Sequence, residues 1–313
     1  MPDLTKSSCI IVTGSIAYDD IMNFPGYFKD HFHPEKLHQI NISFVVDRLN
    51  KHLGGTATNI AFNITRLTGK KTLILGAMGK DHKNLTDFYD ECKIDYSGCI
   101  ISKDLYTSTG KVMTDKADNQ IWSYYYGAGA KGKDVSFDRY AEGAFVILSA
   151  NHADAFLHAQ NYCIEHAIPY LYDPGMSLTW IADQDLERGV KHASFVVGND
   201  YEIAQMERRL KKKLLDVVPA SCGVITTLGA AGVLYQSAQE KLQAKAYPIQ
   251  KLIDPTGAGD AWRGGFVAAL SEGKSLQDAL RFGNALASFA VESVGTANHR
   301  PTKSQIEKRA ITL

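Results

Sequence analysis

Short apolar runs rich in β-branched residues recur along the chain, and segments with helical spacing lie between them. The runs predict buried strands at 9–13, 72–75, 145–148, 170–172, 195–197 and 224–227. Apolar residues three and four positions apart predict helices at 56–67, about 152–167, about 181–192 and about 200–213. Because strands that alternate with helices form βαβ units, we expect an α/β fold with a mostly parallel sheet covered on both faces.

Two other segments alternate apolar and polar residues, a pattern typical of strands with one exposed face. They are 36–48 and 105–126, and a polar turn stands at 116–119. The sequence contains no repeat and no low-complexity linker. We therefore expect a single domain over 1–313, with a small β-sheet lid formed by about 15–48 and 105–130 as excursions from it.

Composition narrows the class of partner. Lys+Arg and Asp+Glu both number 34, so no overall field favours nucleic acid or an anionic membrane. The five cysteines are scattered without a C-x-x-C pair, which is typical of reduced thiols in the cytosol. No segment approaches ~18 uninterrupted apolar residues. We expect a soluble cytoplasmic protein.

Three motifs invite other interpretations. The stretch 127–132 matches G-x-G-x-x-G, but a dinucleotide site needs a helix directly after it and an acid ~20 residues on, so a mobile glycine-rich loop fits better. The stretch 273–275 resembles the end of a P-loop, yet Ala268 stands where that motif requires glycine. His31 and His33 favour a surface loop over a metal site.

The stretch 253–266 places an acid beside a glycine loop. A strand-like lead-in ends at Asp254, and Gly257, Ala258 and Gly259 precede Asp260 where a helix begins. Unpaired backbone N–H groups and the positive end of the helix dipole make such a helix start an anion site. A carboxylate there suits a general base that deprotonates a hydroxyl while the amides hold a phosphoryl group. The alternative is an N-cap acid next to a structural turn.

Five motifs together resemble the ribokinase-like (PfkB) family of sugar and nucleoside kinases, in the order expected of that family and over nearly the whole chain. They are Gly54-Gly55 with Asn59 (G-G-x-x-x-N), Gly76 to Asp81 (G-x-x-G-x-D), Asn199 to Glu202 (N-x-x-E), Thr227 to Gly232 (T-x-G-x-x-G) and Asp254 to Asp260 (D-x-x-G-A-G-D). The resemblance implies a three-layer α/β/α fold with the small sheet as a lid over the site.

The resemblance also implies residue roles. Asp260 becomes the catalytic base, with an anion hole at Gly257, Ala258 and Gly259. Asn199 and Glu202 would organise Mg²⁺ through water beside the phosphates of ATP. The remaining expected contacts are Asp19, Gly54, Gly55 and Asn59 for the acceptor, Thr227, Gly229 and Gly232 bordering the nucleotide, and Asn284 with 293–295 beside the adenine.

Three residues that follow the base have separate expectations. Arg263 lies three positions after Asp260 on nearly the same helix face, where it either reaches the transferring phosphate with ATP bound or forms a structural ion pair. Gly264 and Gly265 would each cost roughly 1 kcal/mol in an ordinary helix, so we expect them to permit close packing of that helix.

Departures from the pattern of the sugar kinases narrow the class of molecule that could accept the phosphate. Thr56 stands where many of them have lysine, and 173–177 lacks their Asn/Arg pair. Segments 14–26, 41–44 and 295–299 look closer to bacterial adenosine and nucleoside kinases. A lid with Phe44, Met113 and Trp122 suits an apolar base, although each could be lid core.

We therefore expect ATP-dependent phosphorylation of a nucleoside 5′-hydroxyl, with adenosine as the favoured acceptor. The alternatives are a ribokinase-like sugar kinase, a binding protein that lost catalysis and, more distantly, a dehydrogenase. The pattern leaves open whether the chain is a monomer or a homodimer, and whether a monovalent cation such as K⁺ binds near Asp254.

Overall fold

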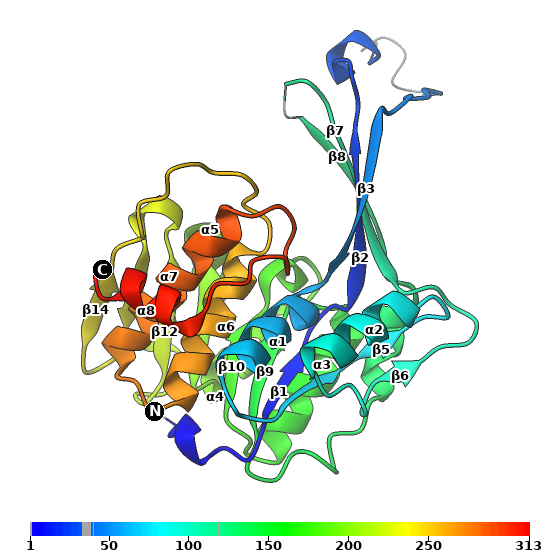
Figure 1. Cartoon of the computed structure of the whole chain (residues 1–313). Coiled ribbons are helices and arrows are strands. Elements are labelled where there is room, and N and C mark those ends of the chain that lie inside the picture. Colours follow the sequence, from blue (N-terminus) through cyan, green and yellow to red (C-terminus); the bar gives the residue numbers. More distant parts are fainter. Residues whose placement is uncertain (1, 33–38, 40, 118) are drawn as a thin grey trace.

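The computed structural model describes residues 2–32, 39, 41–117 and 119–313, except for the side chain of Trp122. An eight-stranded sheet lies at the centre of the main body (Figure 1). Its strands, in spatial order, are β14 (Lys241–Ala244), β13 (Val233–Gln236), β12 (Gly223–Thr227), β11 (Phe195–Asn199), β10 (Tyr170–Asp173), β9 (Phe145–Ser149), β1 (Ile10–Thr13) and β4 (Thr72–Leu75). The six strands from β12 to β4 run parallel, and β13 and β14 continue antiparallel at one edge.

Helices bury both faces of this sheet, as the continuous apolar runs predict. One face packs against α1 (Thr56–Leu67), α2 (Lys83–Cys92), α6 (Ala258–Ser271), α7 (Leu276–Val291) and α8 (Lys303–Ala310). The other packs against α3 (Ala153–Glu165), α4 (Asp183–His192) and α5 (Asp200–Leu210). Alternate residues of β1 divide between the two cores, because Ile10 and Val12 belong to the first and Ile11 to the second.

A second sheet projects from the body, as Figure 1 shows at the upper right. Its order is β3 (Arg48–Gly54), β2 (Ala17–Asn23), β7 (Ser108–Thr114) and β8 (Gln120–Tyr125). β2 pairs parallel with β7, with Ala17 opposite Ser108, so segments 91 residues apart lie side by side. A two-stranded sheet of β5 (Ala77–Met78) and β6 (Ile100–Ile101) lies beside the body.

Two details of this second sheet differ from the sequence-based expectation. The prediction of a strand at 36–48 is wrong, because the described residues of that range contain no strand except at Arg48, where β3 begins. The missed strand β2 is one of the two central strands of the sheet, between β3 and β7. Both β2 and β3 carry mixed polar residues and are half-exposed or exposed over most of their length, so neither shows the period-2 pattern that marks a half-buried strand.

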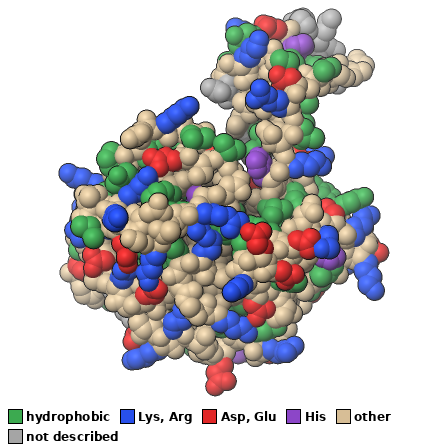
Figure 2. All heavy atoms as spheres, viewed as in Figure 1, with side chains coloured by type: hydrophobic (Ala, Val, Ile, Leu, Met, Phe, Trp, Pro, Cys, Tyr) green, Lys and Arg blue, Asp and Glu red, His purple; other side chains and the backbone are tan. Residues whose placement is uncertain are grey.

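Short 3₁₀ helices complete the chain, at η1 (Leu4–Lys6), η2 (Phe28–Asp30), η4 (Gly127–Asp134), η5 (Gly175–Thr179), η6 (Leu214–Asp216) and η7 (Gly229–Ala231). The G-x-G-x-x-G stretch at 127–132, which we expected to be a glycine-rich loop, is instead part of a 3₁₀ helix in which Ala128, Gly129 and Gly132 are buried, and no α-helix follows it directly. Within the part of the chain that the structure describes, no helix is both long and apolar enough to cross a bilayer. Figure 2 shows acidic and basic side chains interspersed over the viewed face.

Candidate active site

A pocket of about 620 Å³ lies at the carboxyl ends of the parallel strands, where open α/β sheets bind ligands. It is lined by residues from the ends of β9 to β12 and from the starts of α1, α5 and α6. The lining comprises Thr56, Ala150, Asp173, Gly175, Met176, Asn199, Asp200, Tyr201, Glu202, Thr227, Gly229, Gly259, Asp260 and Arg263. Seven of the predicted site residues are therefore brought together in one pocket.

The start of α6 has the backbone geometry of an anion site. Gly257 is the N-cap with φ at +78°, and a Cβ there would lie 2.8 Å from the Cβ of Thr296. The backbone N–H groups of Gly257, Gly259 and Asp260 have no acceptor in the described part of the chain. Free N–H groups at a helix start, next to a glycine with no Cβ in the way, form a site for a phosphate oxygen.

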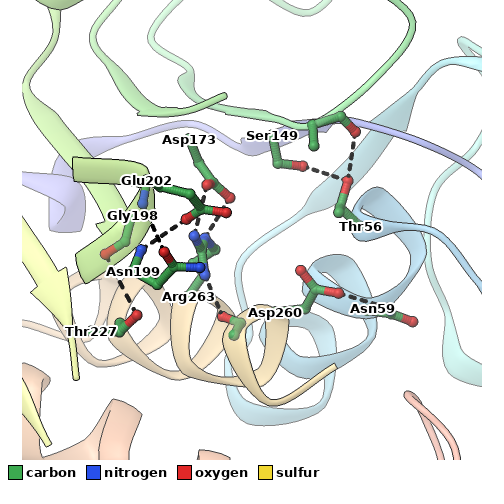
Figure 3. A network of polar contacts seen from close by, with 12 residues as sticks. Thr56, Asn59, Ser149, Asp173, Gly198, Asn199, Glu202, Thr227, Asp260 and Arg263 are labelled. Carbon is green, nitrogen blue, oxygen red and sulfur yellow. Dashed lines mark hydrogen bonds and ion pairs between the residues drawn. The ribbon is translucent and has the colours of Figure 1, made fainter. Parts of the chain in front are cut away.

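Asp260 lies at the same helix start, and its carboxylate points toward α1 (Figure 3). The Nδ2 of Asn59 donates to its Oδ2 at 2.8 Å. Burial raises the pKa of Asp260 to about 6, and the nearby carboxylates of Asp19 and Glu202 act in the same direction. The bond from Asn59 and the charge of Arg263 oppose that rise. Asp260 is consequently ionised at neutral pH with a pKa much closer to neutrality than an ordinary aspartate has.

Arg263 is held by Asp173, a site residue that the sequence analysis did not assign. The two side chains are buried, 8% and 5% exposed, and form an ion pair whose Nη2 to Oδ1 distance is 2.7 Å. Nη1 of Arg263 also donates to the carbonyl of Gly259 at 3.0 Å. The pair thus joins the end of β10 to the anion site. Contact of Arg263 with a phosphate stays a prediction; the ion pair is present (Figure 3). The position of Asp173 directly after an apolar strand was the available sequence signal.

Asn199 and Glu202 form a capping box at the start of α5. The Oδ1 of Asn199 accepts the N–H of Glu202 at 2.8 Å, and Oε2 of Glu202 accepts the N–H of Asn199 at 2.8 Å. This arrangement fixes both side chains at the pocket wall. The Oε1 atom of Glu202 accepts no hydrogen bond from the described residues, so one carboxylate oxygen is available to a ligand.

The glycines predicted to border the nucleotide differ in position. Gly229 lines the pocket with φ at +55°, next to Thr227, whose hydroxyl donates to the carbonyl of Gly198 at 3.5 Å. Gly232 lies outside the lining, and a Cβ there would stand 2.1 Å from the carbonyl oxygen of Ala244. Close packing against Ala244 therefore requires glycine at position 232, and a nucleotide contact by Gly232 stays a prediction.

The predicted acceptor residues gather at the base of the second sheet. A Cβ on Gly54 would stand 2.1 Å from Oδ2 of Asp19, so glycine at that position lets the carboxylate lie against the backbone. Burial raises the pKa of Asp19 to about 6, with the adjacent Asp20 adding to the effect. Gly55 has φ at +89° and begins α1. Asn59, one turn further on, connects this group to Asp260.

Thr56 was noted only as a departure from sugar kinases, yet it lines the pocket. Its Oγ1 donates to the carbonyl of Ala150 at 3.0 Å and accepts from the hydroxyl of Ser149 at 2.8 Å and the N–H of Ser15 at 3.2 Å. The hydroxyl thus ties the start of α1 to the end of β9, as the bond with Ser149 in Figure 3 shows, and through Ser15 to the end of β1.

Asn284 lies outside the pocket lining, and its amide is fully engaged. Nδ2 donates to the carbonyls of Ala244 and Lys245 at 3.0 and 2.8 Å, and Oδ1 accepts from Nε1 of Trp262 at 2.9 Å. These bonds give Asn284 a positioning role for the chain after β14, and a contact of Asn284 with adenine stays a prediction.

Asp254, near which a monovalent cation is predicted, accepts N–H groups from Gly295 at 3.0 Å and Thr256 at 2.9 Å. Burial alone would raise the pKa of Asp254, but these two bonds hold it below its usual value. Neither a cation there nor an adenine contact by 293–295 is tested by this geometry, and both stay predictions.

Phe44 and Met113 are not placed at the acceptor site. Phe44 packs against Phe24, Phe28 and His31 at the far tip of the second sheet, with ring centroids 4.9 to 5.4 Å apart. Met113 lies three residues beyond Gly110, which pairs with Asp19, so the period-2 alternation puts it on the opposite face. The side chain of Trp122, like the whole of His33, lies outside the described residues.

Close packing at the two glycines of α6 is confirmed. A Cβ on Gly264 would stand 2.6 Å from the Cβ of Asn63 in α1, and a Cβ on Gly265 would stand 3.2 Å from the Cα of Gly283 in α7. Larger residues would push α6 away from both neighbours, and with it the anion site.

Comparisons with known proteins agree with this geometry. The family described as "pfkB family carbohydrate kinase" matches residues 15–303. A nucleoside kinase of Methanothermobacter thermautotrophicus is 29% identical over 311 residues, which cover 98% of this chain and 96% of that protein.

Two solved structures extend the likeness to three dimensions. The nucleoside kinase of Burkholderia thailandensis in complex with inosine is 26% identical, with a TM-score of 0.86 over 97% of both chains. The nucleoside kinase of Methanocaldococcus jannaschii is 26% identical, with a TM-score of 0.86 over 98% of this chain and 99% of that one. The fold is ribokinase-like, and the chain is a phosphotransferase with an alcohol acceptor that belongs to the pfkB family of carbohydrate kinases.

Proposed function

We propose that this chain is an ATP-dependent nucleoside kinase that phosphorylates the 5′-hydroxyl group, with adenosine as the favoured acceptor. The observation that carries the proposal is the position of Asp260. Its carboxylate stands between the acceptor residue Asn59 and the free amides of Gly257 and Gly259, where a hydroxyl and a phosphoryl group would meet.

Asp260 would accept the proton of the acceptor hydroxyl as that oxygen attacks the γ-phosphorus. The amides at the start of α6 would hold the phosphoryl oxygens while charge develops on them. A pKa of about 6 leaves the carboxylate ionised at pH 7.5, yet basic enough to take a proton in the transition state. Asn59 would keep the carboxylate aimed at the acceptor.

The nucleotide would occupy the part of the pocket that Asn199, Thr227 and Gly229 line. The free Oε1 of Glu202 fits Mg²⁺, an ion that binds through one or two carboxylates and retains several waters. The ion would neutralise phosphate charge during transfer. The chain's own contribution is the capping box, which holds Glu202 in one orientation.

The face of the second sheet that bears Asp19 supports a nucleoside rather than a free sugar. Cross-strand pairing and period-2 alternation put Ile21, Val112 and Tyr124 on that face. Gly110, between Asp19 and Tyr124 in the same row, adds no side chain there. The pairing with β3 adds His52 and Asn50 to the same face, and Val112 is buried, so the partly exposed Ile21 and Tyr124 supply the apolar contacts that suit a flat base. The structure of the Burkholderia relative with inosine supports the same acceptor class.

The test is ADP release from MgATP across adenosine, inosine, guanosine, cytidine, ribose and fructose. 5′-Deoxyadenosine serves as the matched control, because it keeps the base and the ribose ring and lacks only the proposed acceptor oxygen. We expect turnover with nucleosides, highest with adenosine, and none with the 5′-deoxy compound. Turnover with free sugars alone would replace the proposal with a ribokinase-like sugar kinase. Nucleoside binding without ADP release would indicate a binding protein that lost catalysis.

A further inference from the structure

Helices α1 and α6 touch at two successive levels. At the first, Asn59 donates to Asp260. At the second, one turn further along both helices, Asn63 packs against Gly264, where a Cβ would stand 2.6 Å from that of Asn63. Because residues four apart lie on the same helix face, a displacement at the second level moves the first.

Asn63 is fully buried, and polar bonds hold its side chain at both ends. Its Nδ2 donates to the carbonyl of Asn59 at 2.9 Å. Its Oδ1 lies 2.8 Å from Nε2 of His299. Since the amide nitrogen already donates, the oxygen must accept, and Nε2 of His299 carries the proton. The backbone carbonyl of the residue that orients Asp260 is thus tied, through one side chain, to His299.

His299 is 2% exposed and neutral in these surroundings. Burial lowers the pKa of His299 to about 4, and the charge of Arg66 on α1 acts in the same direction. Arg66 donates to the carbonyl of His299 at 3.1 Å, Arg300 follows it in the chain, and Phe62 lies edge-on at 5.7 Å between ring centroids. Nδ1 has no partner among the described residues. A neutral imidazole whose N–H donates to Asn63 holds that side chain in place and does not transfer protons.

The segment that carries His299 also supports the anion site. Gly295 donates to Asp254, and the hydroxyl of Thr296 donates to the carbonyl of Leu53 at 3.1 Å, at the acceptor end of β3. Thr296 is also the residue that lies against Gly257. One short segment, 295–299, therefore contacts the anion loop, the acceptor strand and the helix that orients the base.

We propose that His299 is a positioning residue for phosphoryl transfer: through Asn63 it fixes the turn of α1 that carries Asn59, and thereby the orientation of the Asp260 carboxylate. The inference rests on the proposed role of Asp260 as the base. His299 does not line the pocket, so its effect passes entirely through these contacts.

The test compares His299→Phe with His299→Gln. Phenylalanine fills the ring volume without a donor, whereas glutamine restores an N–H that can reach Asn63. We expect His299→Phe to lower kcat about tenfold, the scale of a small misplacement in an active site, with KM for ATP unchanged. The acid limb of the pH–rate profile should move to higher pH, because a loosened Asn59 no longer lowers the pKa of Asp260 as strongly. His299→Gln should recover both values.

Charged groups around Asp260 stay the same in these variants, namely Asp19 on β2, Asp173 on β10, Glu202 on α5 and Arg263 on α6. His158→Phe is the matched control. The Nε2 of His158 lies 2.8 Å from the carbonyl of Val135, beside Phe137 and on the other face of the sheet. Its loss should reduce stability to a similar degree and leave the acid limb in place.

Asn63→Ala supplies a second route if His299→Phe does not fold. It removes both bonds at once and should move the acid limb in the same direction, and adding His299→Gln to it should change nothing further. An acid limb that coincides with that of the wild type in every folded variant would overturn the inference. Asp260→Asn distinguishes a failure of the positioning role from a failure of the proposed function. If Asp260→Asn is inactive while His299→Phe has wild-type kinetics, only the positioning role fails. Full activity in Asp260→Asn would remove the proposed function itself.

Discussion

Replacing Asp260 with asparagine should make the protein more stable at neutral pH while it lowers turnover by about 10²–10⁴-fold. The carboxylate of Asp260 is half-buried, and its burial together with the neighbouring carboxylates of Asp19 and Glu202 disfavours its charged form. Asparagine keeps the shape of the side chain, and its Oδ1 can still accept the bond from Asn59. The substitution therefore removes the charge and leaves the packing largely unchanged.

The size of the effect follows from the pKa. A pKa of about 6 in the folded protein, against 3.8 for an ordinary aspartate, means that the folded state binds more protons than the unfolded state between these values. The charged form thus destabilises the fold above pH 6, and this penalty disappears as the pH falls toward 4. At about 1.4 kcal/mol per pKa unit, and after allowance for partial solvent screening, we expect a gain of about 1–3 kcal/mol at pH 7.5.

Urea unfolding followed by tryptophan fluorescence between pH 4.5 and 8 would measure this difference. Asp254→Asn is the matched control in the same loop. Its carboxylate accepts two backbone N–H groups, which lower its pKa, so this variant should lose stability at neutral pH and lose less as the pH falls. An Asp260→Asn variant that is no more stable than the wild type at pH 7.5, or whose gain grows toward low pH, would refute the reasoning.

Three further outcomes are expected. Asp173→Asn leaves the buried charge of Arg263 unpaired and should lower the free energy of unfolding by about 3–5 kcal/mol in urea titrations. This effect is opposite in sign to that of Asp260→Asn. An unchanged unfolding midpoint would contradict the buried ion pair. Gly257→Ala forces a Cβ toward Thr296 at positive φ and should cost about 1–3 kcal/mol and raise KM for ATP, measured by calorimetry and initial rates; wild-type values in both would argue against the anion loop. Finally, kcat/KM should fall as the pH drops through about 6, since Asp260 must be unprotonated to act as a base; a flat profile from pH 5 to 8 would contradict that role.

Much of the central sheet could be predicted from the sequence. Each predicted strand run there overlaps an observed parallel strand, and the helix predicted at 56–67 is observed as α1, Thr56–Leu67. Buried parallel strands are continuous apolar runs, and amphipathic helices repeat every three to four residues, so both leave a local signal. The spatial order of the strands is set by contacts between distant segments and leaves none.

The candidate site divides in the same way. Motif residues such as Asp260, Asn199 and Glu202 could be found because short spacings place them at helix starts. Asp173 and His299 could not be assigned, since their roles depend on partners 90 and 236 residues away in the sequence. The base-covering role suggested for Met113 depended on sheet register, which one residue of slip reverses, whereas Phe44 lies in no strand and packs against Phe24.

The most direct test of the central claim is the identity of the product formed from adenosine and ATP labelled in its γ-phosphate. We predict that the wild-type protein transfers the label to the 5′-oxygen of adenosine, as read by phosphorus NMR coupling to the 5′ protons. Asp260→Asn should reduce the rate by about 10²–10⁴-fold. Label found only in inorganic phosphate, or only in a sugar phosphate when free ribose replaces the nucleoside, would contradict the account.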